Sequence, residues 1–440
     1  MTLAAHDLGA VLERLDARAE ALTLTLQEMI RIRSVNPAFD ADSPGEGAMA
    51  DDVARRYGAL GIDVERHEAV PGRPNLVARL RGAGGADAPH LLVNAHLDTV
   101  PADVGEWYDP FTGRRSGPWE VDPFGGERRD GQVYGRGAAD HKSPIAALLF
   151  ALEAIRHAGM ELDGHLTCIH DVDEETGGRD GIDHLASVMP FDFDMVLYAC
   201  SSQFTPLGRE FFSAMGSDNV IRAFAGWHTY RITVAGQNLH NLTPRLALGA
   251  VEAALPLLDR LRELAQRVNA EVVPLEGSGQ PRMRISAVDA GTRTAFHHQA
   301  RSCDIVLTRR IPAGTDPEAA LAELRTLVDE HTASYPDNPA TLTLEREIPP
   351  HETPADHPVV RAFTRAVEQV TGRTPTVTGL PAPVGISALL RHRHLPTVLF
   401  GYGHLNQHHA PNEHISEAAL LDMAKTYAVA IVNCLGVARA

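Results

Sequence analysis

Four clusters of histidine and acidic residues constrain this chain more than any other feature of its sequence. They are His96-x-Asp98, Asp140 within the glycine-containing segment 135–142, the acidic run Asp173-Glu174-Glu175, and the segment 404–414 with its four histidines. Each cluster follows a predicted strand along the chain. Polar side chains at the carboxyl ends of strands in an open α/β sheet face the crevice where ligands bind. We therefore expect the four clusters to meet at one edge of one sheet.

Taken singly, each cluster also fits an ordinary structural role. A histidine at a strand end is often solvated, and Asp140 stands where an aspartate can cap a helix. The acidic run fits a solvated turn, and the histidine-rich segment fits an exposed loop. Taken together, imidazoles and carboxylates without clustered thiolates suit Zn²⁺ or another divalent first-row ion. A carboxylate shared by two such ions would make a two-metal site that activates water.

The hydrophobic pattern predicts a fold of α/β class. An apolar periodicity over residues 7–32 predicts one amphipathic helix. Strands alternate with helices between residues 60 and 200, which is typical of a largely parallel sheet. The pattern changes to strand, helix, strand, helix over residues 226–345, which predicts a small inserted α+β domain. We expect residues 1–225 and 346–440 to form the two parts of the main domain.

Composition excludes several classes of partner. The chain has 40 basic and 57 acidic residues, a formal charge of −17, which argues against nucleic acids and anionic membranes as partners. No segment has 18 consecutive apolar residues, and no secretory leader is visible, so a soluble cytoplasmic protein is expected. The four cysteines lie far apart with no CxxC pair, which argues against a disulfide scaffold.

The motifs together resemble those of a known enzyme family. The succession is His96-x-Asp98, Gly-Arg-Gly-x-x-Asp140-x-Lys, Asp-Glu174-Glu175-x-Gly and His409-Ala-Pro-Asn-Glu. It resembles the M20 metallopeptidases across residues 15–435. That family includes acetylornithine deacetylase, succinyl-diaminopimelate desuccinylase, aminoacylase and glutamate-releasing carboxypeptidases. The resemblance implies a zinc-peptidase-like mixed sheet flanked by helices, with an inserted ferredoxin-like α+β domain that serves as lid and dimerisation domain.

The resemblance also implies a set of metal ligands. Asp140 would bridge two zinc ions, Glu175 and His409 would complete one of them, and His96 would bind the other. One or two ions per subunit are expected, with Co²⁺ or Mn²⁺ as alternatives to Zn²⁺.

Further residues receive catalytic and binding roles from the same resemblance. Asp98 would orient His96, and Glu174 would be the general base that activates water and then protonates the leaving nitrogen. In the inserted domain, His240 would reach the oxyanion across a homodimer, and Arg310 would bind a substrate carboxylate.

Several positions depart from the family pattern. Cys200 stands where the family supplies a carboxylate ligand for the second zinc ion. A thiolate can bind zinc, so Cys200 is a candidate ligand, but a buried inert cysteine is the alternative. Without Cys200, the second site would be weak, empty, or filled by Asp192 or Asp194. Residue 141 is a histidine where the family has methionine, and the family's Asp is missing from residues 384–388.

The resulting hypothesis is a zinc-dependent hydrolase that cleaves the amide of an N-acyl amino acid or small peptide. Two alternatives remain open. One is hydrolysis of another C–N bond, in a ureido or carbamoyl group. The other is a non-catalytic metal-binding homologue, which the departures at Cys200 and near Ser387 would allow.

Overall fold

The protein is described by a computed structural model that covers residues 5–103, 117–203, 218–237, 240, 248–271, 279–291, 298–390 and 393–438. The chain divides into two compact units. The first unit comprises Met1–Arg222, Thr353–Thr378 and Ala388–Ala440, and the second comprises Ala223–Glu352 and Gly379–Ser387.

A mixed sheet forms the centre of the first unit. Its strands lie in the order β1 (Val64–Glu68), β2 (Pro74–Leu80), β6 (His165–His170), β3 (His90–Asn94), β7 (Met195–Tyr198), β15 (Thr397–Leu399) and β8 (Asn219–Phe224). Strand β3 runs parallel to β6 and β7, and β15 runs parallel to β7, whereas β2 is antiparallel to β1 and β6. The carboxyl ends of β3, β6, β7 and β15 therefore meet at one edge of the sheet.

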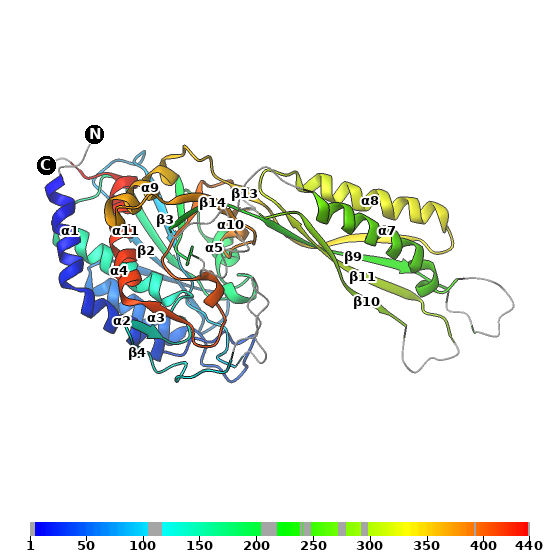
Figure 1. Ribbon diagram of the computed structural model, residues 1–440, viewed down its shortest axis with the longest axis horizontal. Helices are drawn as coiled ribbons and strands as arrows, with labels where there is room; N and C mark the ends of the chain where they lie inside the picture. Colours follow the sequence, from blue (N-terminus) through cyan, green and yellow to red (C-terminus); the bar gives the residue numbers. More distant parts are fainter. Residues whose placement is uncertain are drawn as a thin grey trace. The chain divides into compact units, whose positions relative to one another are not determined.

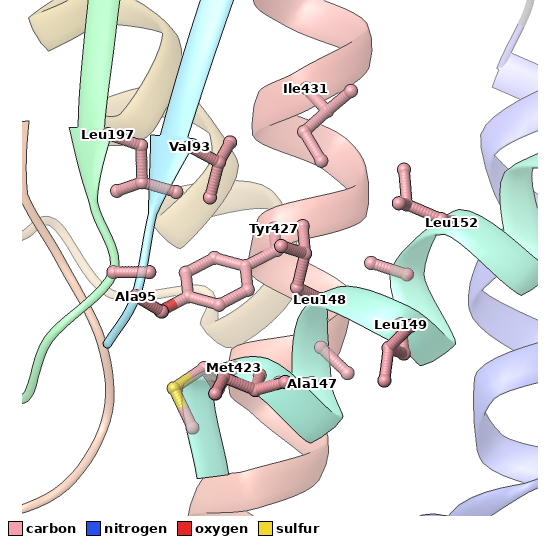
Figure 2. Close-up of a cluster of buried hydrophobic side chains, with 14 of the residues drawn as sticks. Val93, Ala95, Ala147, Leu148, Leu149, Leu152, Leu197, Met423, Tyr427 and Ile431 are labelled. Carbon is pink, nitrogen blue, oxygen red and sulfur yellow. The ribbon is translucent and has the colours of Figure 1, made fainter. Parts of the chain in front are cut away.

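Two long helices build the core against this sheet. Helix α4 (Lys142–His157) is buried along nearly its whole length, and α11 (Glu417–Leu435) packs against it. Figure 2 shows Tyr427 and Leu148 side by side with Val93 of β3. Burying an apolar side chain of this size contributes about 1.5–3 kcal/mol. This packing fixes the start of α4, which lies two residues after Asp140.

Helix α11 is long and apolar enough to cross a membrane by length and composition alone. However, 61% of its most apolar window is buried inside the protein, where it contacts α4 and α9 (Pro358–Thr371). Its apolar composition is therefore that of a core helix.

The predicted helix over residues 7–32 is wrong in one respect, because the structure has two helices there. Helix α1 (Ala5–Ala17) ends before Arg18, whose ψ angle of 6° is not helical, and α2 (Ala19–Arg31) begins after it. Arg18 forms an ion pair with Glu153 of α4 and places its guanidinium over the ring of Phe150. A break of one residue leaves the apolar periodicity almost unchanged, so the pattern could not reveal it.

Shorter elements complete the first unit. They are α3 (Gly47–Ala59), α5 (Ile182–Val188), α10 (Ser387–Leu390), the 3-10 turns η1 (Glu174–Thr176) and η2 (Leu405–Gln407), β14 (Thr376–Leu380), and a small sheet of β16 (His414–Ser416), β5 (Gln132–Tyr134) and β4 (Glu127–Arg129).

The second unit has the ferredoxin-like order of elements, βαββαβ. Its antiparallel sheet has the strand order β10 (Arg282–Ala290), β11 (Ser302–Ile311), β9 (Gly226–Ala235), β12 (Ala340–Ile348). Helices α7 (Ala250–Ala270) and α8 (Pro317–Ser334) cover one face of this sheet (Figure 1). Burial alternates along β9 and β11, and the inward residues form a separate apolar core with α7 and α8. The short strand β13 (His351–Glu352) pairs with the last residues of β8.

Candidate metal centre

Three of the predicted clusters follow strands of the central sheet at its shared edge. His96 comes just after β3, Glu174 and Glu175 lie in η1 beyond β6, and His409 follows β15 and η2. Asp140 reaches the same place differently. It stands two residues before α4, and the strand that precedes it, β5, belongs to the small separate sheet. The start of a helix, and not the end of a central strand, therefore positions Asp140.

Asp140 lies between two pairs of histidine side chains. Its Oδ1 atom is 3.3 Å from Nε2 of His96 and 3.1 Å from Nε2 of His141. Its Oδ2 atom is 3.0 Å from Nδ1 of His408 and 3.4 Å from Nε2 of His409. A carboxylate whose two oxygens face separate sets of nitrogen atoms has the arrangement expected of a ligand shared by two ions.

Two sets of side chains have ligand atoms close enough together to hold a metal ion. The sets are His96, Asp140 and His141, and Asp140, Glu175 and His409. Within each set, all ligand atoms lie within 4.8 Å of one another. The four ligands implied by the family resemblance are thus brought together, and Asp140 is common to both sets.

The hydrogen bonds and charges around His96 suit a cation in the first set. Its Nδ1 atom lies 2.9 Å from the carbonyl oxygen of Asp98, so Nδ1 must carry the hydrogen and donate it. The Nε2 atom of a neutral imidazole then has only a lone pair, and it faces an oxygen of Asp140. Burial lowers the pKa of His96, but neighbouring carboxylates, chiefly that of Glu174, outweigh burial and hold the pKa well above its usual value. This arrangement suits a cation beside Nε2.

The second set also has the character of a cation site. Glu175 pairs with His409 at 2.9 Å, and its other oxygen, Oε1, is buried with no hydrogen-bond partner among the described residues. Burial and the charge of Asp140 raise the pKa of Glu175 to about 7. Burial lowers the pKa of His409, but hydrogen bonds to Asp140 and Glu175 raise it to about 11. The clustered carboxylates therefore stabilise positive charge at this position, and the same charges would stabilise a divalent cation.

Glu174 lies beside the two ligand sets without belonging to either. Its Oε1 atom accepts a hydrogen bond of 2.9 Å from the hydroxyl of Tyr198, and its Oε2 atom is 3.8 Å from Nε2 of His96. Burial, together with the charges of Asp140 and Asp98, raises its pKa, although His96 and Tyr198 oppose the shift. A carboxylate held beside the ligands with a raised pKa suits proton transfer.

Asp98 positions the turn that carries the two glutamates. Its carboxylate accepts hydrogen bonds of 3.1 Å from the backbone amides of Glu174 and Glu175. The side-chain amide of Asn36 donates a third at 2.8 Å. Its backbone carbonyl accepts from His96, so one residue orients both a candidate ligand and the candidate base.

The structure does not bring Cys200 into either set of ligand atoms. Cys200 lies two residues after β7 and is buried, and burial together with nearby carboxylates raises the pKa of its thiol well above the usual value. Asp192 and Asp194, the other candidates, precede β7 and so lie at the opposite end of that strand. Asp192 is exposed and pairs with Arg393, and Asp194 accepts a hydrogen bond from the amide of His90.

Three residues at this site were not predicted from the sequence. His141 and His408 contact Asp140, and Tyr198 binds Glu174. The signal for the histidines was their direct adjacency to Asp140 and His409, because neighbours of a ligand often share its surroundings. Nothing in the sequence distinguished Tyr198 from an ordinary buried strand residue.

A buried ion pair joins the loop of Asp140 to the loop of His409. Arg136 and Glu413 are almost fully buried and lie 2.8 Å apart. The Glu413 carboxylate also accepts hydrogen bonds from the backbone amides of Gly137, Ala139 and Asp140.

Arg136 holds the second loop directly. It donates to the backbone carbonyls of His409 and Ala410, and it lies over the ring of Trp119. The relative placement of two candidate ligands on distant parts of the sequence therefore depends on this pair.

Two predicted site residues belong to the second unit. His240 is exposed and lies in an isolated bridge with His298, their rings 5.3 Å apart. Arg310 is in β11 opposite Arg282 of β10, and its Nε atom is buried with no partner among the described residues. Burial, together with Arg282 and Arg284, lowers the pKa of Arg310. Such an arginine is suited to binding an anion.

Glu413→Gln should destabilise the protein by about 3–5 kcal/mol, because it leaves the buried Arg136 charge without its partner. The matched control is Asp192→Asn, which removes the carboxylate of an exposed arginine pair and should cost less than about 1 kcal/mol. Urea unfolding of both variants measures the difference. Equal losses in the two variants would contradict the positioning role of Glu413.

Comparison with known proteins agrees with this geometry. The sequence profile of peptidase family M20/M25/M40 matches residues 92–433. The chain is 24% identical to an N-formyl-4-amino-5-aminomethyl-2-methylpyrimidine deformylase of Bacillus subtilis (strain 168), over 85% of this chain and 86% of that protein. It is 25% identical to an acetylornithine deacetylase of Vibrio vulnificus (strain CMCP6), over 88% of this chain and 90% of that protein.

The fold is also that of solved structures. One is a dinuclear metal-binding M20 peptidase from Bacillus subtilis, with a TM-score of 0.67 and 15% identity, covering 96% of this chain and 100% of that one. The chain thus belongs to peptidase family M20/M25/M40, and it is an enzyme of the metal-dependent amidohydrolase class.

Proposed function

We propose that the protein hydrolyses the amide bond of an N-acyl amino acid or small peptide, and that its metal is zinc. The observation that carries this proposal is the position of Glu174. It lies next to both candidate ligand sets, is oriented by Tyr198, and belongs to neither set. An imidazole and carboxylate donor set suits Zn²⁺, with Co²⁺ or Mn²⁺ as substitutes.

Each residue has a distinct task in the proposed reaction. His96, Asp140, Glu175 and His409 would hold the ions. When bound, a divalent pair supplies Lewis acidity to the scissile carbonyl and to a water molecule. Glu174 accepts the proton of the attacking water and returns it to the leaving nitrogen. The hydroxyl of Tyr198 keeps the Glu174 carboxylate in one orientation during both transfers.

Two residues of the second unit would recognise the substrate. Arg310 would bind its carboxylate through a guanidinium fork, since its buried Nε atom has no hydrogen-bond partner among the described residues. His240 would stabilise the oxyanion of the partner subunit's reaction.

Four free cysteines are consistent with a reducing compartment, so we propose the cytoplasm as location.

A panel of formyl, acetyl and succinyl amino acids and of dipeptides tests the proposed function. We expect turnover of at least one of these amides by the zinc-loaded protein. Ureido and carbamoyl compounds belong in the same panel, because water attack on their carbonyl would use the same residues. Turnover of these alone would replace the proposed substrate class with the other C–N bond.

Glu174→Gln should lower the rate on the best substrate by about 10²–10⁴, the usual contribution of a general base. Because Glu174 is outside both ligand sets, the variant should keep the same metal content, measured by elemental analysis. A variant that retains both metal and full turnover would remove Glu174 from the mechanism.

Tyr198→Phe should change how the rate depends on pH. The hydroxyl donates to the charged form of Glu174, so its loss raises the pKa of Glu174. A base works only when it is ionised, so the acidic limb of the kcat/KM profile should move to higher pH. A hydrogen bond to a charged group is worth about 1.5–3 kcal/mol, so the shift should be roughly one to two pH units. Tyr335→Phe, in the second unit, is the control and should leave the profile in place.

The homodimer is a separate part of the proposal. Helix α7 exposes Val251 and Leu255, one turn apart on the same face, at 46% and 55%. Light scattering should give twice the chain mass of 47.5 kDa. Leu255→Arg should reduce it to that of one chain, and an unchanged mass would remove this face from the interface.

A further inference from the structure

We propose that His141 is a ligand of the second metal ion, that this ion is held by His96, Asp140 and His141, and that Cys200 is not a ligand. The assignment rests on the proposed function only in assuming that the site holds metal. The family resemblance implies neither His141 nor any nitrogen ligand at this position.

The first support is geometric. The Nε2 atoms of His96 and His141 both face Oδ1 of Asp140, at 3.3 Å and 3.1 Å, and the two rings are 4.0 Å apart. All three side chains are at least nine-tenths buried. Three ligand atoms around one point, without competing solvent, already provide most of a tetrahedral site.

The second support comes from hydrogen-bond accounting. Because Nδ1 of His96 donates to Asp98, the lone pair of Nε2 points toward Asp140. Neutral His141 has one hydrogen for two nitrogens, and its buried Nδ1 atom has no partner among the described residues, so no hydrogen bond at Nδ1 fixes the tautomer and Nε2 is free to present a lone pair as well. Two imidazole nitrogens beside one carboxylate oxygen are poorly satisfied by hydrogen bonds alone. A cation between them would satisfy all three atoms.

Cys200 lacks the corresponding geometry. Its sulfur is absent from both ligand sets among the described residues, although cysteine sulfur is a common zinc ligand. Cys200 lies between the end of β7 and the chain at Gly401, where an added Cβ would come within 2.7 Å of its carbonyl oxygen. This tight backbone packing limits how far Cys200 can shift toward Asp140.

The position of His408 distinguishes it from His141. Its Nδ1 atom is 3.0 Å from Oδ2 of Asp140, the oxygen that also faces His409. His408 therefore lies on the side of the Glu175 set, and it does not compete for the His96 side.

Using His141 in place of the family's carboxylate ligand changes the charge of the metal centre. A neutral imidazole in place of an anionic carboxylate or thiolate leaves the metal pair one unit more positive. Imidazole also favours Zn²⁺, Co²⁺ and Ni²⁺ over Mn²⁺ and Mg²⁺, which prefer oxygen ligands. We expect the second position to discriminate against Mn²⁺ more strongly than the first.

Metal content tests the assignment without reference to activity. The purified full chain is loaded with Co²⁺, freed of excess ion and analysed for cobalt. We expect two ions per chain in the wild type and in Cys200→Ser, and one ion in His141→Met. His414→Met is the matched control, because His414 lies in β16, donates to the backbone carbonyl of Asn412 and belongs to neither ligand set. It should keep two ions.

The absorption spectrum of the cobalt protein gives a second readout that needs no variant. A thiolate ligand would produce a sulfur-to-cobalt charge-transfer band, and we expect none in the wild type. The band, or the loss of an ion in Cys200→Ser, would overturn the assignment, as would two ions in a folded His141→Met protein. Loss of one ion in His141→Met, together with no turnover of any panel substrate by the wild-type protein, would refute the proposed function and leave this ligand set intact.

Discussion

The buried pair of Arg136 and Glu413 is the interaction on which the rest of the site depends. Glu413 accepts hydrogen bonds from the backbone amides that precede α4, and Arg136 donates hydrogen bonds to the backbone carbonyls around His409. An unpaired charge at either position would face a strong desolvation penalty, so both loops must close together. The Gly-Arg-Gly and His-Ala-Pro-Asn-Glu motifs therefore act together, because the arginine of one pairs with the glutamate of the other.

The surrounding electrostatics follow from the same enclosure. Asp98, Asp140, Glu174 and Glu175 are gathered in a small volume, and burial raises the pKa of both glutamates. Histidines that face these carboxylates hold protons more strongly, as His96 and His409 do. Gathering these carboxylates costs free energy unless positive charge lies among them. The kinds of ligand atom and the excess of acidic groups therefore both favour a bound cation.

The sequence predicted much of the site, because ligands after parallel strands must meet at one sheet edge. This reasoning predicted that the clusters of His96, Glu175 and His409 would lie close together, and the family resemblance singled out these residues and Asp140 as candidate ligands. It left Cys200 open as a candidate ligand and did not single out His141, since spacing along the chain gives no side-chain direction. The break at Arg18 was also hidden, because helices on both sides of it keep the same apolar face.

The ferredoxin-like unit has an apolar core of its own, and every residue of the two candidate ligand sets lies in the other unit. Substitutions on its surface therefore leave the residues of both ligand sets in place. Selection can act on the two units separately. A lineage built on this plan can change one unit without rebuilding the metal centre in the other.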